Sequence, residues 1–282
     1  MAKACYVGVD GKARKIKKIY TGVSGVARKV KKGYVGVGGV ARPFYSAEPE
    51  LAYYGKATDL SVRHGDLAAT TVGNYALFGG GRQYSTTVDA YSDTLVRSTP
   101  TGLSAGRSNL ATTTVGSYAL FGGGYGGSYL ATVDAYSDTL VRSTPTELSQ
   151  VRSQLAATTV GNYALFGGGY KSPETFATVD AYSDTLVRST PTALSVPVHR
   201  NAATTVGNYA LFGGGIVSYG VAYKIVDAYS DTLVRSTPTS LSIERYALAA
   251  TTVGNYALFG GGYEGIRNAV NSATVDVYTI TQ

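Results

Sequence analysis

The residues best suited to acid–base chemistry in this sequence are five aspartates that recur at one place in a repeated motif. Each is the second residue of Val-Asp-Ala-Tyr or Val-Asp-Val-Tyr, at Asp89, Asp134, Asp180, Asp227 and Asp276. A carboxylate can serve as a general acid or base, but such a group needs its own tuned environment. A carboxylate present in every repeat is better explained as scaffold, accepting backbone N–H groups or pairing with an arginine.

The two histidines are the next candidates, as an acid–base pair. His64 and His199 lie beside Arg63 and Arg200 in different repeats, and no nucleophile accompanies them. We therefore predict that they bind a ligand at the surface. Cys5 is the only cysteine, which excludes a disulfide framework and a cysteine-based zinc site. The recurrent Gly-Gly-Gly lacks the Lys-Ser/Thr of a phosphate loop. The sequence predicts no enzyme, no metal site and no cofactor.

Composition indicates the elements that carry these residues. The chain has 282 residues, with 36 glycines, 24 tyrosines and only 15% charged residues. Abundant Gly, Thr, Val and Tyr favour β-strands joined by tight turns. No apolar run approaches the ~20 residues of a membrane span. The N-terminus does not resemble a secretory signal, so we expect synthesis in the cytoplasm without a signal peptide.

Charge divides the chain into two modules. The net charge is +7, yet residues 1–45 contain eleven lysines and arginines and one acidic residue, Asp10. The remainder is slightly acidic. Such asymmetry favours separate modules. We predict a basic module at 1–45, a linker at 46–50 and a second domain at 51–282.

A period of 14 residues organises the basic module. The motif Tyr-x-Gly-Val-x-Gly-x-Ala-Arg begins at Tyr6, Tyr20 and Tyr34. Glycine in a two-residue turn predicts strand–turn–strand units, a β-hairpin-repeat module. Its basic residues have three alternative interpretations. They form a solvated strand face, they bind a polyanion, or they anchor the chain in an assembly. The anchoring candidates are Lys12, Arg14, Lys15, Arg28, Lys29 and Arg42.

A longer repeat fills the rest of the chain. Its aromatic-aliphatic strand places phenylalanine at Phe78, Phe121, Phe166, Phe212 and Phe259, a period in the mid-forties. Within the first copy we predict four strands, at 67–72, 75–78, 87–91 and 94–98. Short strands at this period are typical of propeller blades.

Strand counting predicts how the ring closes. The first three strands occur five times, but the fourth occurs only four times before the chain ends. Aligning Leu60-Ser61 with Leu103-Ser104 makes residues 51–56 the missing outer strand. A ring hides its edges by pairing its first and last strands. We therefore predict an all-β, five-bladed β-propeller closed by an N-terminal strand and preceded by the hairpin module.

The long repeat resembles the kelch repeat over residues 51–278. The likeness lies in the aromatic-aliphatic strand that ends in glycines and in the following Val-x-x-Tyr. The usual tryptophan of the fourth strand is absent, and leucine takes its place at Leu95, Leu140, Leu186 and Leu233. The resemblance implies leucines that fill the space between blades. It implies no particular function, because the fold supports many.

The repeats differ from one another in two places. Loops after Gly-Gly-Gly vary in length, at 82–87, 125–132, 170–178, 216–225 and 263–274. Connectors at 62–66, 105–109, 150–154, 196–200 and 243–247 vary in identity. Because strands alternate in direction, both sets emerge at one end of the blades, which we call the diversified end. The other end has short Gly-Asn and Ser-Asp turns.

Loops on a rigid scaffold commonly carry recognition, and tyrosine supplies contact area at low entropic cost. Unconstrained drift of loops is the alternative explanation. The predicted ligand-binding residues are Tyr84, Tyr125, Tyr129, Tyr170, Phe176, Tyr219, Tyr223, Tyr246, Tyr263, His64, Arg107, Arg152, His199 and Arg245.

The basic repeats, which end in Ala41-Arg42-Pro43-Phe44, resemble N-terminal modules of prophage tail-region proteins of Gram-positive bacteria. This resemblance implies a virion or particle-tail location, with the module attached to a tail component. We therefore expect a phage-tail-type receptor-binding or adhesin component that recognises a cell-surface glycan or protein. A second copy of the chain, in a homo-oligomer, is a further candidate partner. The alternatives are an intracellular kelch-type scaffold, whose basic module contacts nucleic acid or membrane, and a glycan-cleaving enzyme.

Overall fold

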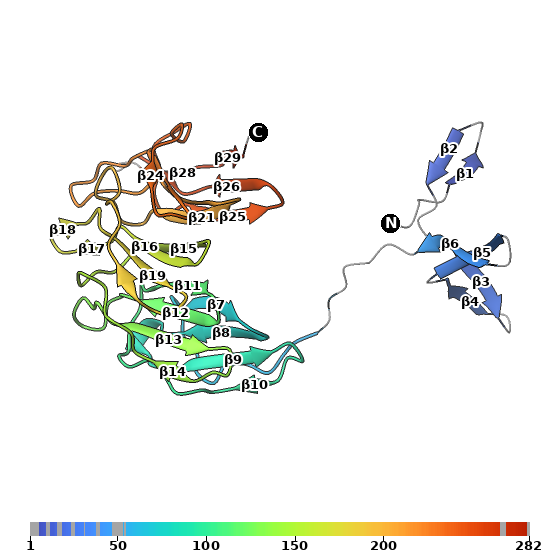
Figure 1. Cartoon of the computed structure of the whole chain (residues 1–282), viewed down its shortest axis with the longest axis horizontal. Coiled ribbons are helices and arrows are strands. Elements are labelled where there is room, and N and C mark those ends of the chain that lie inside the picture. Colours follow the sequence, from blue (N-terminus) through green and yellow to red (C-terminus); the bar gives the residue numbers. More distant parts are fainter. Residues whose placement is uncertain are drawn as a thin grey trace. The chain divides into compact units, whose positions relative to one another are not determined.

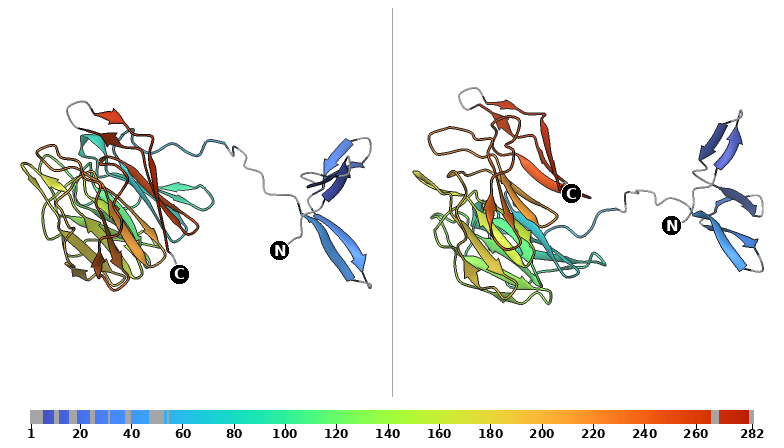
Figure 2. Two further views of the ribbon diagram at one scale, coloured as in Figure 1. Left: turned by 90° about the horizontal axis from the view of Figure 1, so that it is seen from above. Right: turned by 45° about the horizontal axis from the view of Figure 1, so that its top comes forward.

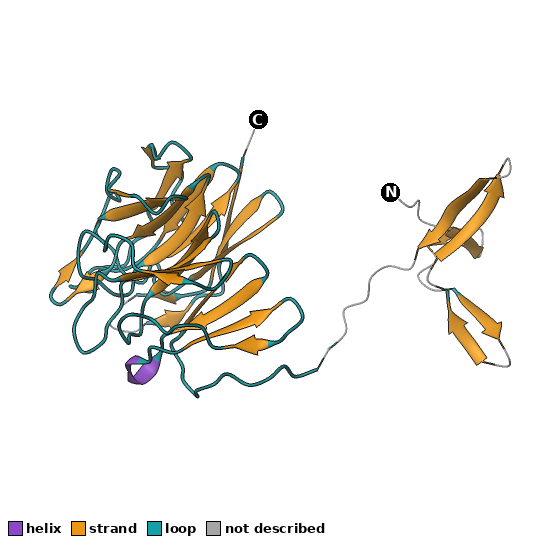
Figure 3. Ribbon diagram, turned by 60° about the horizontal axis from the view of Figure 1, so that its bottom comes forward, coloured by secondary structure: helices purple, strands orange, loops and turns teal. Residues whose placement is uncertain are grey.

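The computed structural model describes residues 6–9, 12–15, 19–23, 26–30, 32–37, 40–46, 53, 55–265 and 269–280. The chain forms two compact units, Met1–Lys56 and Ala57–Gln282. The fold is all-β: apart from one helical turn, η1 (Arg82–Tyr84), the elements of the described ranges are strands (Figure 3).

The first unit contains three antiparallel hairpins. β1 (Tyr6–Val9) pairs with β2 (Lys12–Lys15), β3 (Tyr20–Val23) with β4 (Val26–Lys29), and β5 (Lys32–Val37) with β6 (Val40–Ser46). The predicted pairs of strands are therefore confirmed. The turns themselves, at 10–11, 24–25 and 38–39, lie outside the described residues. The candidate anchoring residues Lys12, Arg14 and Lys15 fall in β2, Arg28 and Lys29 in β4, and Arg42 in β6.

The second unit contains five antiparallel sheets that lie side by side in chain order (Figure 1, Figure 2). The first strands are β7 (Ala68–Val72), β11 (Ala111–Val115), β15 (Ala156–Val160), β21 (Ala202–Val206) and β25 (Ala249–Val253). The second strands are β8 (Tyr75–Gly79), β12 (Tyr118–Gly122), β16 (Tyr163–Gly167), β22 (Tyr209–Gly213) and β26 (Tyr256–Gly260). The third strands are β9 (Val88–Ser92), β13 (Val133–Ser137), β19 (Val179–Ser183), β23 (Val226–Ser230) and β29 (Val275–Thr279).

Fourth strands complete the first four sheets. They are β10 (Arg97–Ser98), β14 (Arg142–Ser143), β20 (Arg188–Ser189) and β24 (Arg235–Ser236). Two small hairpins occupy the loops, β17 (Tyr170–Lys171) with β18 (Glu174–Thr175) and β27 (Tyr263–Glu264) with β28 (Val270–Asn271). The repeated antiparallel sheets confirm a β-repeat domain of propeller-like type.

Each pair of neighbouring sheets buries one apolar cluster, and the four clusters form the core. Between the third and fourth sheets, Phe212 and Tyr229 lie against Leu165 and Val179. The Phe212 ring also lies over Gly167, where an added β-carbon would be 2.7 Å from the ring. Glycine at this strand end therefore permits the close approach of the next sheet.

Threonine hydroxyls link the first strands of neighbouring sheets. The Oγ1 atoms of Thr113 and Thr159 are 2.7 Å apart, and those of Thr158 and Thr205 are 2.9 Å apart. Comparable pairs join Thr70 to Thr114 and Thr204 to Thr252. The small Ala and Thr side chains of these strands thus allow close packing and satisfy their own hydroxyls.

The fourth strands are shorter than the predicted span 94–98. Leu95 adopts a left-handed conformation, with φ of 61°, within a turn closed by a 3.0 Å bond from Ser92 N to Val96 O. Strand pairing therefore begins only at Arg97. The corresponding Leu140, Leu186 and Leu233 lie at the surfaces between sheets and pack on their clusters, as expected. Leu95 itself is exposed.

The fifth sheet has three strands, in the order β25-β26-β29. Residues 51, 52 and 54 of the predicted closing strand lie outside the described residues, and Tyr53, Gly55 and Lys56 are not in a strand. Val275 and Val277 are 54% and 55% exposed, whereas their equivalents in the fourth sheet are buried. Closure of the ring therefore stays a prediction.

The glycine contact yields a test of sheet packing. Replacing Gly167 by alanine should lower the free energy of unfolding by about 1–3 kcal/mol, the usual cost of overpacking, because the Phe212 ring must move. Gly65→Ala is the control, since an added β-carbon there meets no atom within 4 Å. Urea unfolding followed by circular dichroism measures both. Equal midpoints would contradict the packing described.

Candidate functional site

The two variable segments of each repeat are joined by backbone hydrogen bonds. Ser153 N donates to Tyr170 O at 3.0 Å, and Tyr170 N donates to Ser153 O at 2.9 Å. The same antiparallel bridge recurs at Ser108–Tyr125, His199–Ile216 and Tyr246–Tyr263. The prediction that loops and connectors share one end of the sheets is confirmed.

Five of the predicted ligand-binding residues form a continuous line of rings, the aromatic row. Its members, in order, are Tyr84, Tyr125, Tyr129, Tyr170 and His199. Successive ring centroids are 5.7, 5.1, 5.9 and 4.9 Å apart. The row crosses the diversified end from the first repeat to the fourth. The three tyrosine–tyrosine contacts are edge-to-face, which orders these rings while leaving surface for a partner.

The other predicted aromatic residues are dispersed. Tyr246 and Tyr263 stack on each other, with centroids 5.5 Å apart. Tyr219 is 90% exposed and stands alone at a loop tip. Phe176 is half-buried, and Tyr223 packs against the core cluster between the third and fourth sheets. His64 is half-buried and does not join the aromatic row.

His199 is a buried residue of the row. Burial and the neighbouring Arg200 charge lower its pKa to about 4, and a hydrogen bond to the backbone of Ile216 only partly opposes them. The imidazole is therefore neutral at neutral pH and lies against the Tyr170 ring, tilted by 32°. It contributes a flat apolar face to the row.

Three predicted ligand-binding residues belong to the scaffold instead. Arg107, Arg152 and Arg245 are fully buried. Arg152 Nη2 lies 2.6 Å from Asp180 Oδ2, Arg107 pairs with Asp134 at 2.8 Å, and Arg245 pairs with Asp276. Their burial contradicts the prediction that they contact a ligand. The physical reason is that a buried charge needs an opposite charge, and each repeat supplies an aspartate.

The recurrent aspartates have the scaffold role expected of them. Asp180 accepts hydrogen bonds from Ser149 N and Ser149 Oγ, both at 3.1 Å, and from Arg188 Nη1 at 2.8 Å. The carboxylate thus joins connector, third strand and fourth strand. Asp89, Asp134, Asp227 and Asp276 accept from the corresponding serine N–H groups.

The structure reveals one position in each connector, with an unusual backbone conformation, that the sequence analysis did not identify. The last connector residue has positive φ in every repeat, between 53° and 56°, at Asp66, Asn109, Gln154, Arg200 and Ala247. Glycine is the residue that most readily adopts a positive φ. None of these five positions is glycine, so the sequence contains no indication of this conformation. In the first repeat this residue forms an exposed ion pair, Asp66–Arg82, at 2.7 Å.

No protein-family model matches the chain, and no curated protein matches it either. Within the described ranges, His, Cys, Asp and Glu form no group of three that could hold a metal ion. Nothing helical in those ranges has the length and apolar character that a membrane crossing requires.

The buried histidine gives a pH-dependent prediction. Below the usual pKa of 6.5 the unfolded chain takes up a proton at residue 199 that the folded chain refuses until about pH 4. The stability advantage of neutral His199 is complete above pH 6.5 and is lost as pH falls toward 4. The free energy of unfolding, minus that of His199→Phe, should therefore fall by at most about 1.4 kcal/mol per pH unit. A pH-independent difference would contradict burial of the imidazole.

Proposed function

We propose that the chain is a non-enzymatic recognition protein, a phage-tail-type receptor-binding or adhesin component that binds a cell-surface glycan or protein. One observation carries the proposal. The chemical differences among otherwise similar repeats are concentrated at one end of the sheets, where paired backbone hydrogen bonds fix loops and connectors to each other. A rigid frame that presents varied loops is suited to recognition.

The side chains at this end support binding over catalysis. The aromatic row and the stacked pair Tyr246–Tyr263 present rings rather than paired acids and bases. Aromatic faces pack on sugar rings and on protein surfaces with little loss of side-chain entropy. The five aspartates that could have served chemistry are engaged in the scaffold.

Attachment is assigned to the basic module. Its three hairpins repeat the motif that resembles prophage tail-region modules, and six of the eleven lysines and arginines of residues 1–45 fall on the second strands of these hairpins. We propose that this module holds the protein in a particle, and that the second unit binds the target.

We further propose that the five sheets form a kelch-like five-bladed ring. Tyr91 Oη donates to Thr58 O at 2.6 Å, just as Tyr136 Oη donates to Thr101 O at 2.7 Å. Thr58 thus occupies the place of Thr101, and this correspondence supports the predicted outer strand at residues 51–56. The chain therefore enters the first sheet as it would from an outer strand of the fifth.

The two end faces support the same conclusion. Phe78 and Tyr91 of the first sheet are half-buried, whereas the equivalent pair Phe121 and Tyr136 is buried under the preceding sheet. Val275 and its neighbours on the fifth sheet form the surface that such a pair covers elsewhere. The faces are complementary because they repeat the surfaces of the four internal contacts.

One glycine tests closure. In a closed ring Phe78 lies over Gly260, so Gly260→Ala should cost about 1–3 kcal/mol, as at Gly167. In five unclosed sheets the added β-carbon meets only Val275 Cγ2, at 3.6 Å, and the substitution should be nearly neutral. Urea unfolding of monomer isolated by gel filtration measures the difference. Wild-type stability of Gly260→Ala would contradict closure.

The recognition function is tested with labelled full-length protein on arrays of bacterial surface polysaccharides and envelope proteins. Tyr219→Ala and Tyr263→Ala remove exposed rings from the diversified end and should weaken binding by about 5- to 30-fold, the effect of 1–2 kcal/mol. Asn162→Ala, in an exposed turn at the opposite end, is the matched control. Equal binding by all three variants would contradict the assignment of the surface, and no binding by wild type would contradict the function.

A further inference from the structure

The positive-φ residues of successive connectors are joined directly through their backbones. Gln154 N donates to Asn109 O at 2.9 Å, Arg200 N to Gln154 O at 2.9 Å, and Ala247 N to Arg200 O at 2.8 Å. Each residue adopts nearly the same left-handed conformation, which is unfavourable for Gln, Arg and Ala. One backbone geometry thus presents a different side chain from each repeat toward a common space. Strain of this kind concentrates at functional sites.

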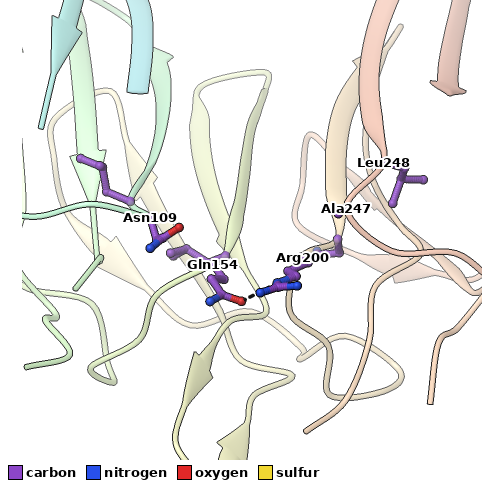
Figure 4. A pocket seen from close by; sticks show the side chains of 8 residues that line it. Asn109, Gln154, Arg200, Ala247 and Leu248 are labelled. Atoms are coloured by element: carbon purple, nitrogen blue, oxygen red, sulfur yellow. Dashed lines mark hydrogen bonds between the residues drawn. The ribbon is translucent and has the colours of Figure 1, made fainter. Parts of the chain in front are cut away.

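The space that these residues surround is a cavity of about 430 Å³. Ligand pockets ordinarily measure about 300–1,000 Å³. Figure 4 shows the side chains of Asn109, Gln154 and Arg200 beside one another at this cavity, with Ala247 and Leu248 on the far side of Arg200 from Gln154. Arg200 Nε donates to Gln154 Oε1 at 3.0 Å, which leaves the two Nη groups of the guanidinium for another partner.

The fourth repeat changes the wall of the cavity. The position after the positive-φ residue is leucine in the other four repeats, but it is Asn201 here. Asn201 is 9% exposed, and neither its Oδ1 nor its Nδ2 has a hydrogen-bond partner. A buried amide without partners costs about 1–3 kcal/mol of stability. Leucine at the same position in the neighbouring repeats avoids that cost, so Asn201 is a polar group suited to binding.

We propose that this cavity binds a sugar that bears one carboxylate, a hexuronic acid, as the terminal unit of a glycan. The inference rests on the proposed recognition function and names its ligand class. Arg200 is the only charged residue among the eight that line the cavity, and a planar guanidinium binds a carboxylate through two parallel hydrogen bonds.

The remaining lining chemistry matches the rest of such a sugar. The amides of Asn109, Gln154 and Asn201 offer both donors and acceptors, as hydroxyl groups require. Leu110, Leu155 and Leu248 also line the cavity, and the half-buried Leu110 supplies apolar surface for the C–H face of the ring. The carboxylate of Asp66 does not oppose an anion there, because Arg82 neutralises it.

Isothermal titration of the full chain with sodium glucuronate and sodium galacturonate tests the proposal, with glucose and galactose as neutral controls. Arg200→Ala should weaken uronate binding by at least about tenfold, as loss of a charged hydrogen-bonding partner does. Asn201→Leu should weaken binding and yet raise the melting temperature, an opposition that a purely structural residue would not show. Both replacement residues already occupy the equivalent position in another repeat. Arg63→Ala, an exposed arginine in the same type of connector, should bind as wild type.

Three results would overturn the inference: no uronate binding at millimolar concentration, equal affinity for uronates and neutral sugars, or undiminished binding by Arg200→Ala. Failure here is distinguishable from failure of the recognition function. If array binding through Tyr219 and Tyr263 persists without uronate binding, only the ligand class is wrong. If uronates bind but no array surface is bound, the recognition function is wrong and the cavity stands as a sugar site.

Discussion

A buried carboxylate in each of the first four repeats is the constraint on which the rest of the second unit depends. Taking a charge out of water is unfavourable unless every lone pair finds a partner. Asp180 finds its partners in Ser149, which directly precedes the connector, in Arg152 of the connector and in Arg188 of the fourth strand. The connector is thereby fixed to the sheet. The contacts of this carboxylate therefore also position the loops and the positive-φ residues of the diversified end.

The strand pattern was predictable because the repeat itself displays it. Alternating apolar residues, glycine turns and a constant spacing identified the first three strands to within a residue or two. The fourth strand was predicted too long, since nothing in Thr-Leu-Val-Arg reveals that Leu95 adopts a left-handed turn. Ring closure was not settled, because it depends on residues 51–56, only partly described, meeting a distant sheet.

The candidate site was predictable as a surface but not as a set of contacts. Variation among repeats located the diversified end, and five of the chosen rings meet in one row. Arg107, Arg152 and Arg245 were misassigned because sequence separation hid the aspartates about 30 residues away that neutralise them. The positive-φ positions were overlooked because their side chains share no chemistry. Only the backbone conformation unites them.

The glycine–phenylalanine contact has a consequence for assembly during folding. It recurs nearly unchanged at all four surfaces between sheets, so the side chains alone do not specify which sheet follows which. The order is imposed by chain connectivity, because only twelve residues separate β10 from β11, and the same length recurs in the later repeats. Two chains folding together present interchangeable surfaces to each other. We therefore expect contacts between sheets of different chains to become more frequent as the protein concentration during refolding rises.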